Sequence, residues 1–396
     1  MKNIYKIGVV LFMALFASCQ ENQDTELTTS NPDDNVPQIS YRAKAKQVFD
    51  LIQQNYKINS TGLYLENFPK QPGDRESSYL WSLDGLLSGV NQLKALGFDD
   101  VALDHSFIAL EKYYDTRRSP SAYAAFPVQY SQDDRFYDDN AIVALDLIEN
   151  YEITQNKAYL DRVKAIAVFS LTGEDNKTGG GLYWSEQNRT NLNSDLCMKA
   201  VSSTAFTVTY LLKLYQHTKD SQYLSFATRL YNWLNLYIKD PASNLFWNDI
   251  RVRDNFVNTR KWTYNSGAMI SNNVLFYEIT GQEQYLTEAR AIAAATFTNF
   301  TRLFDNKRFF PEHDSWFNVC LFRGYLDLLR HDTTAQNYVN TFIQNADYAW
   351  EKARNEYGLF YEDWSGVKVG RDKWLLQQAG LVEMYGRIAL LKGEHE

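Results

Sequence analysis

The stretch YEITQNKAYL, residues 151–160, returns as YQHTKDSQYL at 215–224 and as YEITGQEQYL at 277–286. Each copy ends one apolar helical segment, passes through a short polar turn and opens the next helix. Self-similarity at a fixed interval is typical of stacked supersecondary units. The intervals of 64 and 62 residues (151 to 215, and 215 to 277) are longer than the roughly 34 residues of a tetratricopeptide repeat, which argues against an open solenoid of that kind.

Extending this register along the chain predicts twelve helical segments. Six of them open after long loops that carry aromatic residues, near Tyr79, Tyr137, Met198, Thr263, Ser315 and Lys373. The other six mostly follow tight connections and open near Tyr41, Asp99, Lys157, Ser221, Glu283 and Thr334. Alternating short and long connections suit a closed ring of helical hairpins. We therefore expect an all-α fold, a six-hairpin α/α barrel with inner and outer helices, forming a single domain over residues 41–393 with at most short β-hairpins in its loops.

The N-terminus has the features of an export signal. Two lysines precede an apolar run at residues 7–16, and small residues lead from this run to Cys19. Such a run is too short to span a membrane and is typical of a secretory signal. We expect residues 1–18 to be a lipoprotein signal peptide and Cys19 to carry the lipid. The alternative is an ordinary signal peptide followed by a chance cysteine.

Residues 19–40 are expected to form a flexible tether, because they are polar, contain two prolines and have almost no large apolar side chain. This predicts a cell-envelope lipoprotein of a Gram-negative bacterium, held to the outer membrane through its lipid anchor only and facing the periplasm or the surface. The remaining cysteines, Cys197 and Cys320, are too few for a disulfide framework. We expect them to be buried free thiols.

Composition restricts the partners of the protein. The net charge of −8 argues against nucleic acid or an anionic membrane surface, since both require a basic face. Aromatic residues make up 15% of the chain, with 27 Tyr, 23 Phe and 9 Trp. Tyr and Trp have an apolar ring and a polar edge, and their faces stack well on sugar rings. The composition therefore favours a carbohydrate ligand, and we expect the protein to be a monomer.

The most informative polar segment is RFYDDNA, residues 135–141, where Asp138 and Asp139 open an apolar helical run. The unpaired N–H groups and the dipole of a helix N-terminus favour negative charge, so one carboxyl can stay ionised while its neighbour keeps a proton. Two carboxyls in different protonation states are what cleavage of a glycosidic bond requires. On these residues alone, the alternative of an acidic first turn that only caps the helix remains open.

In a closed barrel the long loops meet at one end, together with the N-termini of the inner helices. This end forms a concave mouth, which is the usual place for a ligand site. Trp316 is also expected at this end. Aromatic and polar residues that the register brings to it are candidate sugar contacts, with plain packing of the loops as the alternative: Trp81, Tyr137, Asn140, Trp184, Tyr264, Asn265, Asp363 and Trp364.

The sequence resembles glycoside hydrolase family 76, the bacterial endo-α-1,6-mannanases, over about residues 43–391. The resemblance is carried by the segments YDDNA (137–141), GGGLYW (179–184), TYNSG (263–267) and FNVCL (317–321), and by Arg323-Gly324. The segment that repeats at 151–160, 215–224 and 277–286, called the repeated phrase below, also contributes to it. It implies a six-hairpin α/α barrel and cleavage of α-1,6-linked mannan with retention of configuration, without a metal or other cofactor. It also implies that Asp138 is the nucleophile and Asp139 the general acid/base.

Neighbouring residues of a helix point about 100° apart, so two carboxyls can straddle an anomeric carbon at the roughly 5 Å that a retaining enzyme needs. One segment departs from the family pattern. Where the family often shows KNAISN, this chain has MKAVSS at 198–203, so that two asparagines able to hold sugar hydroxyls are replaced. We therefore expect that the sugar or linkage accepted by this protein can differ from that of the family.

Two other readings compete with a mannanase. One is a different carbohydrate enzyme on an α/α barrel, such as an unsaturated uronyl hydrolase, a lyase or a sugar epimerase. Lyases and epimerases need a His or Tyr base with Arg clamps, which the predicted helix starts hardly offer. The other is a glycan-binding lipoprotein that keeps the barrel without cleaving its ligand, and the intact Asp138-Asp139 pair argues against it.

Overall fold

The computed structural model describes residues 39–312, 315–369 and 373–395. The chain divides into two compact units, residues 1–38 and 39–396, and the second unit contains all of the described residues. The predicted signal peptide, Cys19 and nearly all of the predicted tether thus lie outside the described part of the chain.

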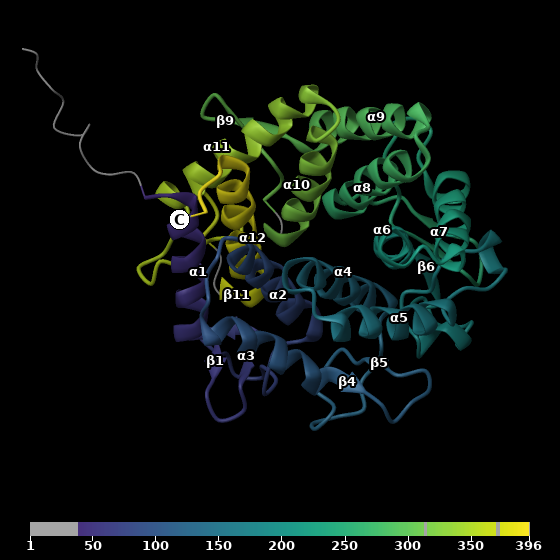
Figure 1. Ribbon diagram of the computed structural model, residues 1–396, viewed down its shortest axis with the longest axis horizontal. Helices are drawn as coiled ribbons and strands as arrows, with labels where there is room; N and C mark the ends of the chain where they lie inside the picture. Colours follow the sequence, from purple (N-terminus) through teal and green to yellow (C-terminus); the bar gives the residue numbers. More distant parts are fainter. Residues whose placement is uncertain (1–38, 313–314, 370–372, 396) are drawn as a thin grey trace, which may run out of the picture. The chain divides into compact units, whose positions relative to one another are not determined.

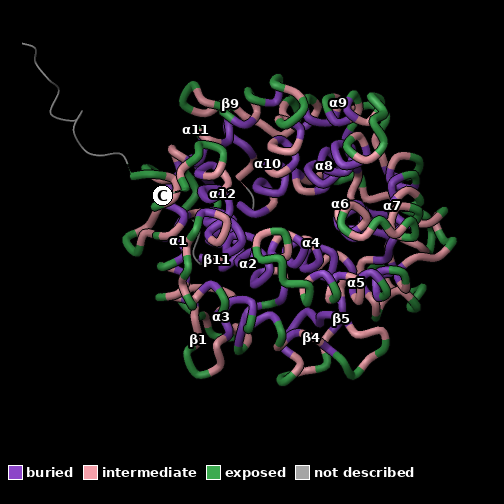
Figure 2. Tube along the Cα trace, in the orientation of Figure 1, coloured by how far each residue is buried: buried purple, intermediate pink, exposed green. Residues whose placement is uncertain are grey.

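Within residues 39–396, the described chain contains twelve α-helices in two layers (Figures 1 and 2). The inner helices, buried along most of their length, are α2 (Leu80–Ala95), α4 (Tyr137–Thr154), α6 (Val201–Thr218), α8 (Thr263–Thr280), α10 (Ser315–Leu329) and α12 (Leu375–Lys392). The outer helices are α1 (Tyr41–Asn55), α3 (Val101–Leu110), α5 (Lys157–Leu171), α7 (Ser221–Trp233), α9 (Glu283–Phe300) and α11 (Gln336–Lys352). Each inner helix contacts the next, and α12 packs against α2. The predicted closed α/α barrel is therefore confirmed.

The repeated phrase builds the tight connection between an inner and an outer helix. After α4, α6 and α8 the chain turns through Gln155, Lys219 or Gly281, each with a positive φ, and the N–H of that residue donates to the carbonyl of the phrase's first tyrosine at 2.8 Å. This is the left-handed helix cap that stops a helix without leaving its last carbonyls unpaired. In all three copies the threonine Oγ1 accepts a hydrogen bond at 3.3 Å from the N–H of the residue two positions further on.

The strands are short and all lie in the loops. They are β1 (Lys57–Ile58), β2 (Leu63–Tyr64), β3 (Asn67–Phe68), β4 (Tyr114–Asp115), β5 (Ala122–Tyr123), β6 (Met198–Ala200), β7 (Asp249–Arg251), β8 (Val257–Asn258), β9 (Arg302–Phe304), β10 (Lys307–Phe309) and β11 (Lys373–Trp374). Antiparallel pairing of β3 with β11 joins the first and last hairpins of the ring. The three-stranded sheet β6-β7-β8 is larger than the isolated hairpins that we expected, because β7 pairs on both edges.

A cluster of ion pairs on α4, α10 and α12 lies inside the barrel. Glu383 on α12 is fully buried and accepts hydrogen bonds from Arg323 Nε at 2.6 Å, Arg323 Nη2 at 2.7 Å and Arg387 Nε at 2.6 Å. Arg387 also donates to Glu149 on α4. Buried charges persist only when they are paired and hydrogen-bonded, and this cluster meets that condition.

Cys197 and Cys320 are buried free thiols, as predicted. Among the residues that the structure describes, no helix combines the length and the apolar character needed to cross a bilayer.

Candidate active site

A cavity of about 500 Å³ opens among the N-terminal ends of the inner helices. Carboxyl groups and aromatic rings line it: Glu66, Tyr79, Trp81, Ala125, Phe136, Asp138, Asp139, Trp184, Tyr264 and Phe317. Five of the predicted site residues, Trp81, Asp138, Asp139, Trp184 and Tyr264, are therefore brought together in one pocket. We call it the catalytic pocket from here on.

Asp138 and Asp139 are the second and third residues of α4, whose N-cap is Phe136. The first N–H of the helix, from Tyr137, donates to the carbonyl of Trp184 at 3.0 Å, so the helix end and the Trp184 loop hold each other in place. Asp138 Oδ1 accepts from the N–H of Asp139 at 3.1 Å, and Asp138 Oδ2 accepts from Ser202 Oγ on α6 at 2.9 Å. Asp138 is thus fixed by two hydrogen bonds that favour its ionised form.

The two carboxyls differ in their affinity for protons. Burial raises the pKa of Asp138 to about 6, against the opposing effect of its hydrogen bonds from Ser202, Trp184 and the backbone. Burial, together with the nearby charges of Asp138 and Asp134, raises the pKa of Asp139 well above its usual range. Asp139 therefore holds its proton to a higher pH than Asp138 does. A buried carboxylate next to a buried carboxylic acid is the arrangement of a nucleophile and a proton donor.

Aromatic rings form the walls of the pocket. Trp184 packs on Phe136 with ring centroids 4.6 Å apart, and Tyr264 lies 4.4 Å from Phe317. Trp81 meets Trp374 edge to face at 4.8 Å and Phe317 at 6.4 Å. Such surfaces match the C–H faces of pyranose rings, and their hydrophobic surroundings strengthen the electrostatic interactions inside the pocket.

Glu66, which precedes β3, is a third carboxyl of the pocket that sequence reasoning missed. Its oxygens accept hydrogen bonds from the N–H of Tyr79 at 2.7 Å, from Ser82 Oγ at 2.8 Å and from Trp374 Nε1. Burial raises its pKa despite these donors. A single glutamate in a short loop has no sequence pattern that would have identified it. Its contacts show that it ties the start of α2 to β11.

Tyr137 and Asn140, which we predicted as sugar contacts, are fully buried behind the pocket. The Tyr137 ring stacks on Phe169 at 4.6 Å. Asn140 Oδ1 accepts from the N–H of Tyr123 at 2.8 Å, and its Nδ2 donates to the carbonyl of Tyr123 at 2.9 Å. Since both side chains are committed to packing or to the β5 backbone, the prediction of direct contact is wrong. They anchor the helix that carries the acids.

Asp363, Trp364, Asn265 and Trp316 also lie outside the lining of the pocket. Asp363 is 2% exposed and accepts from Ser365 Oγ at 2.6 Å, and Trp364 donates from Nε1 to Ser315 Oγ at 2.9 Å. Asn265 is fully buried beside Asn248, with 3.4 Å between their side-chain amides, and Trp316 packs inside the barrel. The expected sugar contacts of Asp363, Trp364 and Asn265 are therefore wrong as direct contacts, because these side chains are buried and do not line the cavity.

None of residues 198–203, where the sequence departs from the family pattern, is in the lining of the pocket. Lys199 is fully buried, with its Nζ 2.8 Å from the carbonyl of Gly181 and 2.9 Å from Asp175 Oδ1, so it holds the glycine-rich loop. Ser203 is also fully buried. The residue of this segment that contacts a catalytic carboxyl is Ser202. The buried side chains of Lys199 and Ser203 are therefore not available to take over sugar contacts from the replaced asparagines.

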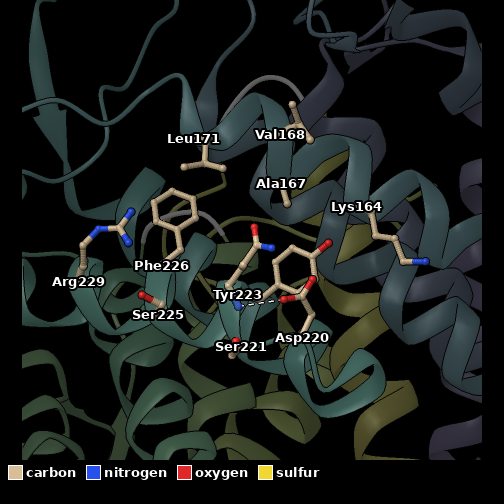
Figure 3. Close-up of a pocket in the computed structure, with 11 residues that line it drawn as sticks. Lys164, Ala167, Val168, Leu171, Asp220, Ser221, Tyr223, Ser225, Phe226 and Arg229 are labelled. Atoms are coloured by element: carbon tan, nitrogen blue, oxygen red, sulfur yellow. Dashed lines mark hydrogen bonds between the residues drawn. The ribbon is translucent and has the colours of Figure 1, made fainter.

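Another cavity of about 500 Å³ lies between the outer helices α5 and α7 (Figure 3). Apolar side chains such as Val168, Leu171 and Phe226 surround it, and Asp220 there is occupied in capping α7 through the N–H of Gln222. It has no pair of adjacent carboxyls, so its size alone does not make it a catalytic site. Within the described ranges, no group of three or more His, Cys, Asp or Glu side chains is placed to hold a metal ion.

An α/α barrel with an aromatic pocket that holds two carboxyls of different proton affinity has the features of an enzyme acting on glycosidic bonds. The sequence profile of glycosyl hydrolase family 76 matches residues 40–389. The chain therefore belongs to glycoside hydrolase family 76, and the resemblance inferred from its motifs is confirmed.

Solved structures and curated relatives agree with this assignment. A family 76 glycoside hydrolase from a bovine Bacteroides thetaiotaomicron strain is 28% identical, with a TM-score of 0.82 over 90% of this chain and 78% of that one. The α-1,6-mannanase of Salegentibacter, solved as an inactive variant at two adjacent aspartates with α-1,6-mannotriose bound, is 19% identical with a TM-score of 0.75, over 89% of this chain and all of that one.

Among curated sequences, mannan endo-1,6-alpha-mannosidase DCW1 of Candida glabrata is 26% identical over 147 residues, which are 35% of this chain. This chain spans less than half of the length of the two curated fungal relatives that it matches, 39% of one and 31% of the other.

Proposed function

We propose that the protein is a retaining glycoside hydrolase that cleaves α-1,6-mannosidic linkages within mannan. The observation that carries this proposal is the pair of adjacent carboxyls, Asp138 and Asp139, which the N-terminus of α4 places in an aromatic pocket. The family and the bound mannotriose of the Salegentibacter enzyme support the choice of linkage.

The reaction proceeds in two steps. In the first, Asp138 attacks the anomeric carbon while Asp139 gives its proton to the oxygen of the departing sugar, so the glycosidic bond breaks and a glycosyl ester forms on Asp138. In the second, the now ionised Asp139 takes a proton from water, and the hydroxide attacks the same carbon and releases Asp138. Two displacements at one carbon leave its configuration unchanged. No redox partner or metal is consumed.

A product profile tests the substrate. The protein is incubated with linear α-1,6-mannan and, separately, with a panel of α-mannobioses that differ in linkage. Release of oligosaccharides from the α-1,6 polymer, with little cleavage of α-1,2 or α-1,3 disaccharides, is the expected result. If the unaltered protein bound mannan without cleaving it, the protein would be a glycan-binding protein and not an enzyme.

The dependence of activity on pH follows from the two pKa values. Asp138 must be ionised to attack, so kcat/KM is expected to fall as the pH drops through about 6. Asp139 must be protonated, so kcat/KM falls again as the pH rises through its own, higher pKa. A rate profile from pH 4 to 10 on a soluble mannooligosaccharide measures both limbs.

Asp134 provides the control for this profile. It accepts from the N–H of Gln187 at 3.0 Å and from Ser185 Oγ, and its charge helps to raise the pKa of Asp139. Asp134→Asn should move the alkaline limb to lower pH, whereas Asp133→Asn, which removes an ion pair with Arg75 at the surface, should not. An alkaline limb that stays in place in Asp134→Asn would contradict the assignment of that limb to Asp139.

We also propose that Cys19 carries a lipid that holds the enzyme at the cell envelope of a Gram-negative bacterium. The support is the N-terminal sequence alone. Mass spectrometry of the N-terminal peptide from the membrane fraction tests it: an acylated Cys19 is expected, and an unmodified mature N-terminus at any other residue would refute it.

A further inference from the structure

The carboxyl of Asp138 receives side-chain hydrogen bonds from two different segments of the chain. Ser202 Oγ, in the first turn of α6, donates to Asp138 Oδ2 at 2.9 Å. Trp184, at the end of the glycine-rich loop (residues 179–184), also donates to this carboxyl. Burial raises the pKa of Asp138, and both contacts oppose that rise. The position of the glycine-rich loop relative to the start of α6 therefore affects how readily Asp138 ionises.

Strand β6 lies between the glycine-rich loop and α6 in space and leads directly into α6. The N–H of Trp184 donates to the carbonyl of Met198 in β6 at 3.1 Å. Lys199, the next residue of β6, forms an antiparallel bridge with Tyr183 of the loop. Since Lys199 is also three residues before Ser202, it lies where the segments that carry the two donors to Asp138 meet.

The ammonium group of Lys199 is fully buried and fastens the loop to β6. Its Nζ lies 2.8 Å from the carbonyl oxygen of Gly181, 3.4 Å from that of Gly173 and 2.9 Å from Asp175 Oδ1. It also lies 3.8 Å from the centre of the Tyr183 ring. The three N–H donors of a lysine thus have three oxygen acceptors. Burial lowers the pKa of Lys199 to about 8, in spite of its pair with Asp175, so the group keeps its charge at neutral pH.

The glycine-rich loop needs such a tie. Gly179, Gly180 and Gly181 have φ angles of 79°, 129° and 73°, a backbone that glycine adopts readily and other residues rarely do. Glycine loses more conformational freedom on folding than any other residue, so a run of three is costly to order. The hydrogen bond from Lys199 orders this run at Gly181, three residues before Trp184.

We propose that Lys199 is a positioning residue for the nucleophile, because its buried ammonium ties the glycine-rich loop to β6 and so holds Trp184 and Ser202 together on the carboxyl of Asp138. The proposal rests on the proposed function, since it concerns the group that attacks the sugar. Lys199 does not line the catalytic pocket and acts only through its neighbours. Without its ammonium, Trp184 should withdraw from Asp138, and the pKa of Asp138 should rise.

The test is the fall of kcat/KM at low pH in Lys199→Met, which removes the charge and keeps much of the length of the side chain. This fall, near pH 6 in the parent, should move up by about one pH unit, as expected for partial loss of one hydrogen bond to a charged group. At pH 5 the variant should then be about tenfold slower than the parent. Lys177→Met is the matched control, because Lys177 pairs with the same Asp175 at 3.5 Å but is 48% exposed, and its profile should match that of the parent.

A double-mutant cycle separates positioning from a general loss of stability. Trp184→Phe keeps an aromatic ring but removes the indole N–H, so it should also move the fall of kcat/KM to higher pH. In that background Lys199→Met should add little, because the hydrogen bond through which it acts is already absent. Two shifts that add in full, or a profile of Lys199→Met that matches the parent, would overturn the proposal.

Two further measurements cover the remaining outcomes. If Lys199→Met does not fold, Asp175→Asn weakens the same buried contact at a partly exposed carboxylate, and it should move the profile in the same direction. An unmoved profile would then refute the positioning role. If the parent cleaves no mannan, the proposed function fails. The role of Lys199 is then decided by carbon NMR of protein labelled at its aspartate carboxyls, with the Asp138 signal identified by its loss in Asp138→Asn. Titration of this carboxyl at higher pH in Lys199→Met supports the role, and an unchanged titration refutes it.

Discussion

Asp138→Asn is expected to lower kcat/KM on α-1,6-mannan by about 10⁴-fold or more, because an amide cannot form the glycosyl ester. The substitution keeps the shape of the side chain, and its oxygen can still accept from Ser202 Oγ. Folding and glycan binding should therefore persist. Release of reducing ends measures the first effect, and calorimetry with a mannooligosaccharide measures the second.

The substitution Asp139→Asn distinguishes the role of Asp139 as proton donor from that of Asp138 as nucleophile. The leaving oxygen of a sugar needs a proton, whereas a nitrophenolate leaving group does not. Asp139→Asn should therefore impair cleavage of mannan far more than formation of the glycosyl enzyme from a nitrophenyl α-mannoside, while Asp138→Asn impairs both. Asp133→Asn, next to the site in sequence but paired with Arg75 at the surface, is the control. Full mannanase activity in Asp138→Asn would contradict the assignment of the nucleophile.

Glu383→Gln is expected to destabilise the fold by about 3–5 kcal/mol, the largest effect on stability that a single buried group here should give. Burial alone would raise the pKa of Glu383, but Arg323 and Arg387 hold it below its usual range, so the side chain is ionised and neutralises two buried guanidinium groups. The amide removes the carboxylate that the two guanidinium groups share, so Arg323 loses its ion pair and Arg387 keeps only its pair with Glu149 at 3.1 Å. Equilibrium unfolding in urea measures the loss as a lower midpoint.

Glu152→Gln is the matched control for this measurement. Glu152 also accepts from two basic side chains, with His217 at 2.9 Å and Lys213 at 3.4 Å, but its side chain is 36% exposed. Exposed ion pairs contribute about 0–1 kcal/mol. If the two variants lost equal stability, the buried cluster would be no more important to the barrel than a surface pair.

The barrel could be predicted from the sequence because the residues that form each tight turn between an inner and an outer helix are close together in the chain. The phrase at 151–160 contains both the tyrosine whose carbonyl accepts the capping N–H and the threonine that holds the turn. Several predicted helix starts lie one to three residues too early, and two of them do so for the same reason. Helix α6 begins at Val201 rather than Met198, and α12 at Leu375 rather than Lys373, because the residues just before them pair as strands β6 and β11. Strand pairing between distant loops leaves no local pattern.

The catalytic pocket was only partly predictable. The acids, Trp184 and Tyr264 were found because helix N-termini and loop aromatics gather at one end of the barrel. The direction of each side chain depends on how its helix is rotated about its own axis, which packing decides. Tyr137 and Asn140 flank the acids in sequence yet point away from the cavity, and Glu66 enters it from a loop without any signature.

The stereochemistry of the first product tests most directly whether the two aspartates act as nucleophile and proton donor. Proton NMR during the first minutes of hydrolysis of a linear α-1,6-mannooligosaccharide distinguishes the two anomers of the new reducing end before they interconvert. Two displacements at the anomeric carbon predict that the α-anomer appears first and that the β-anomer grows in later by mutarotation. Initial formation of the β-anomer would mean a single displacement by water, which contradicts a glycosyl ester on Asp138.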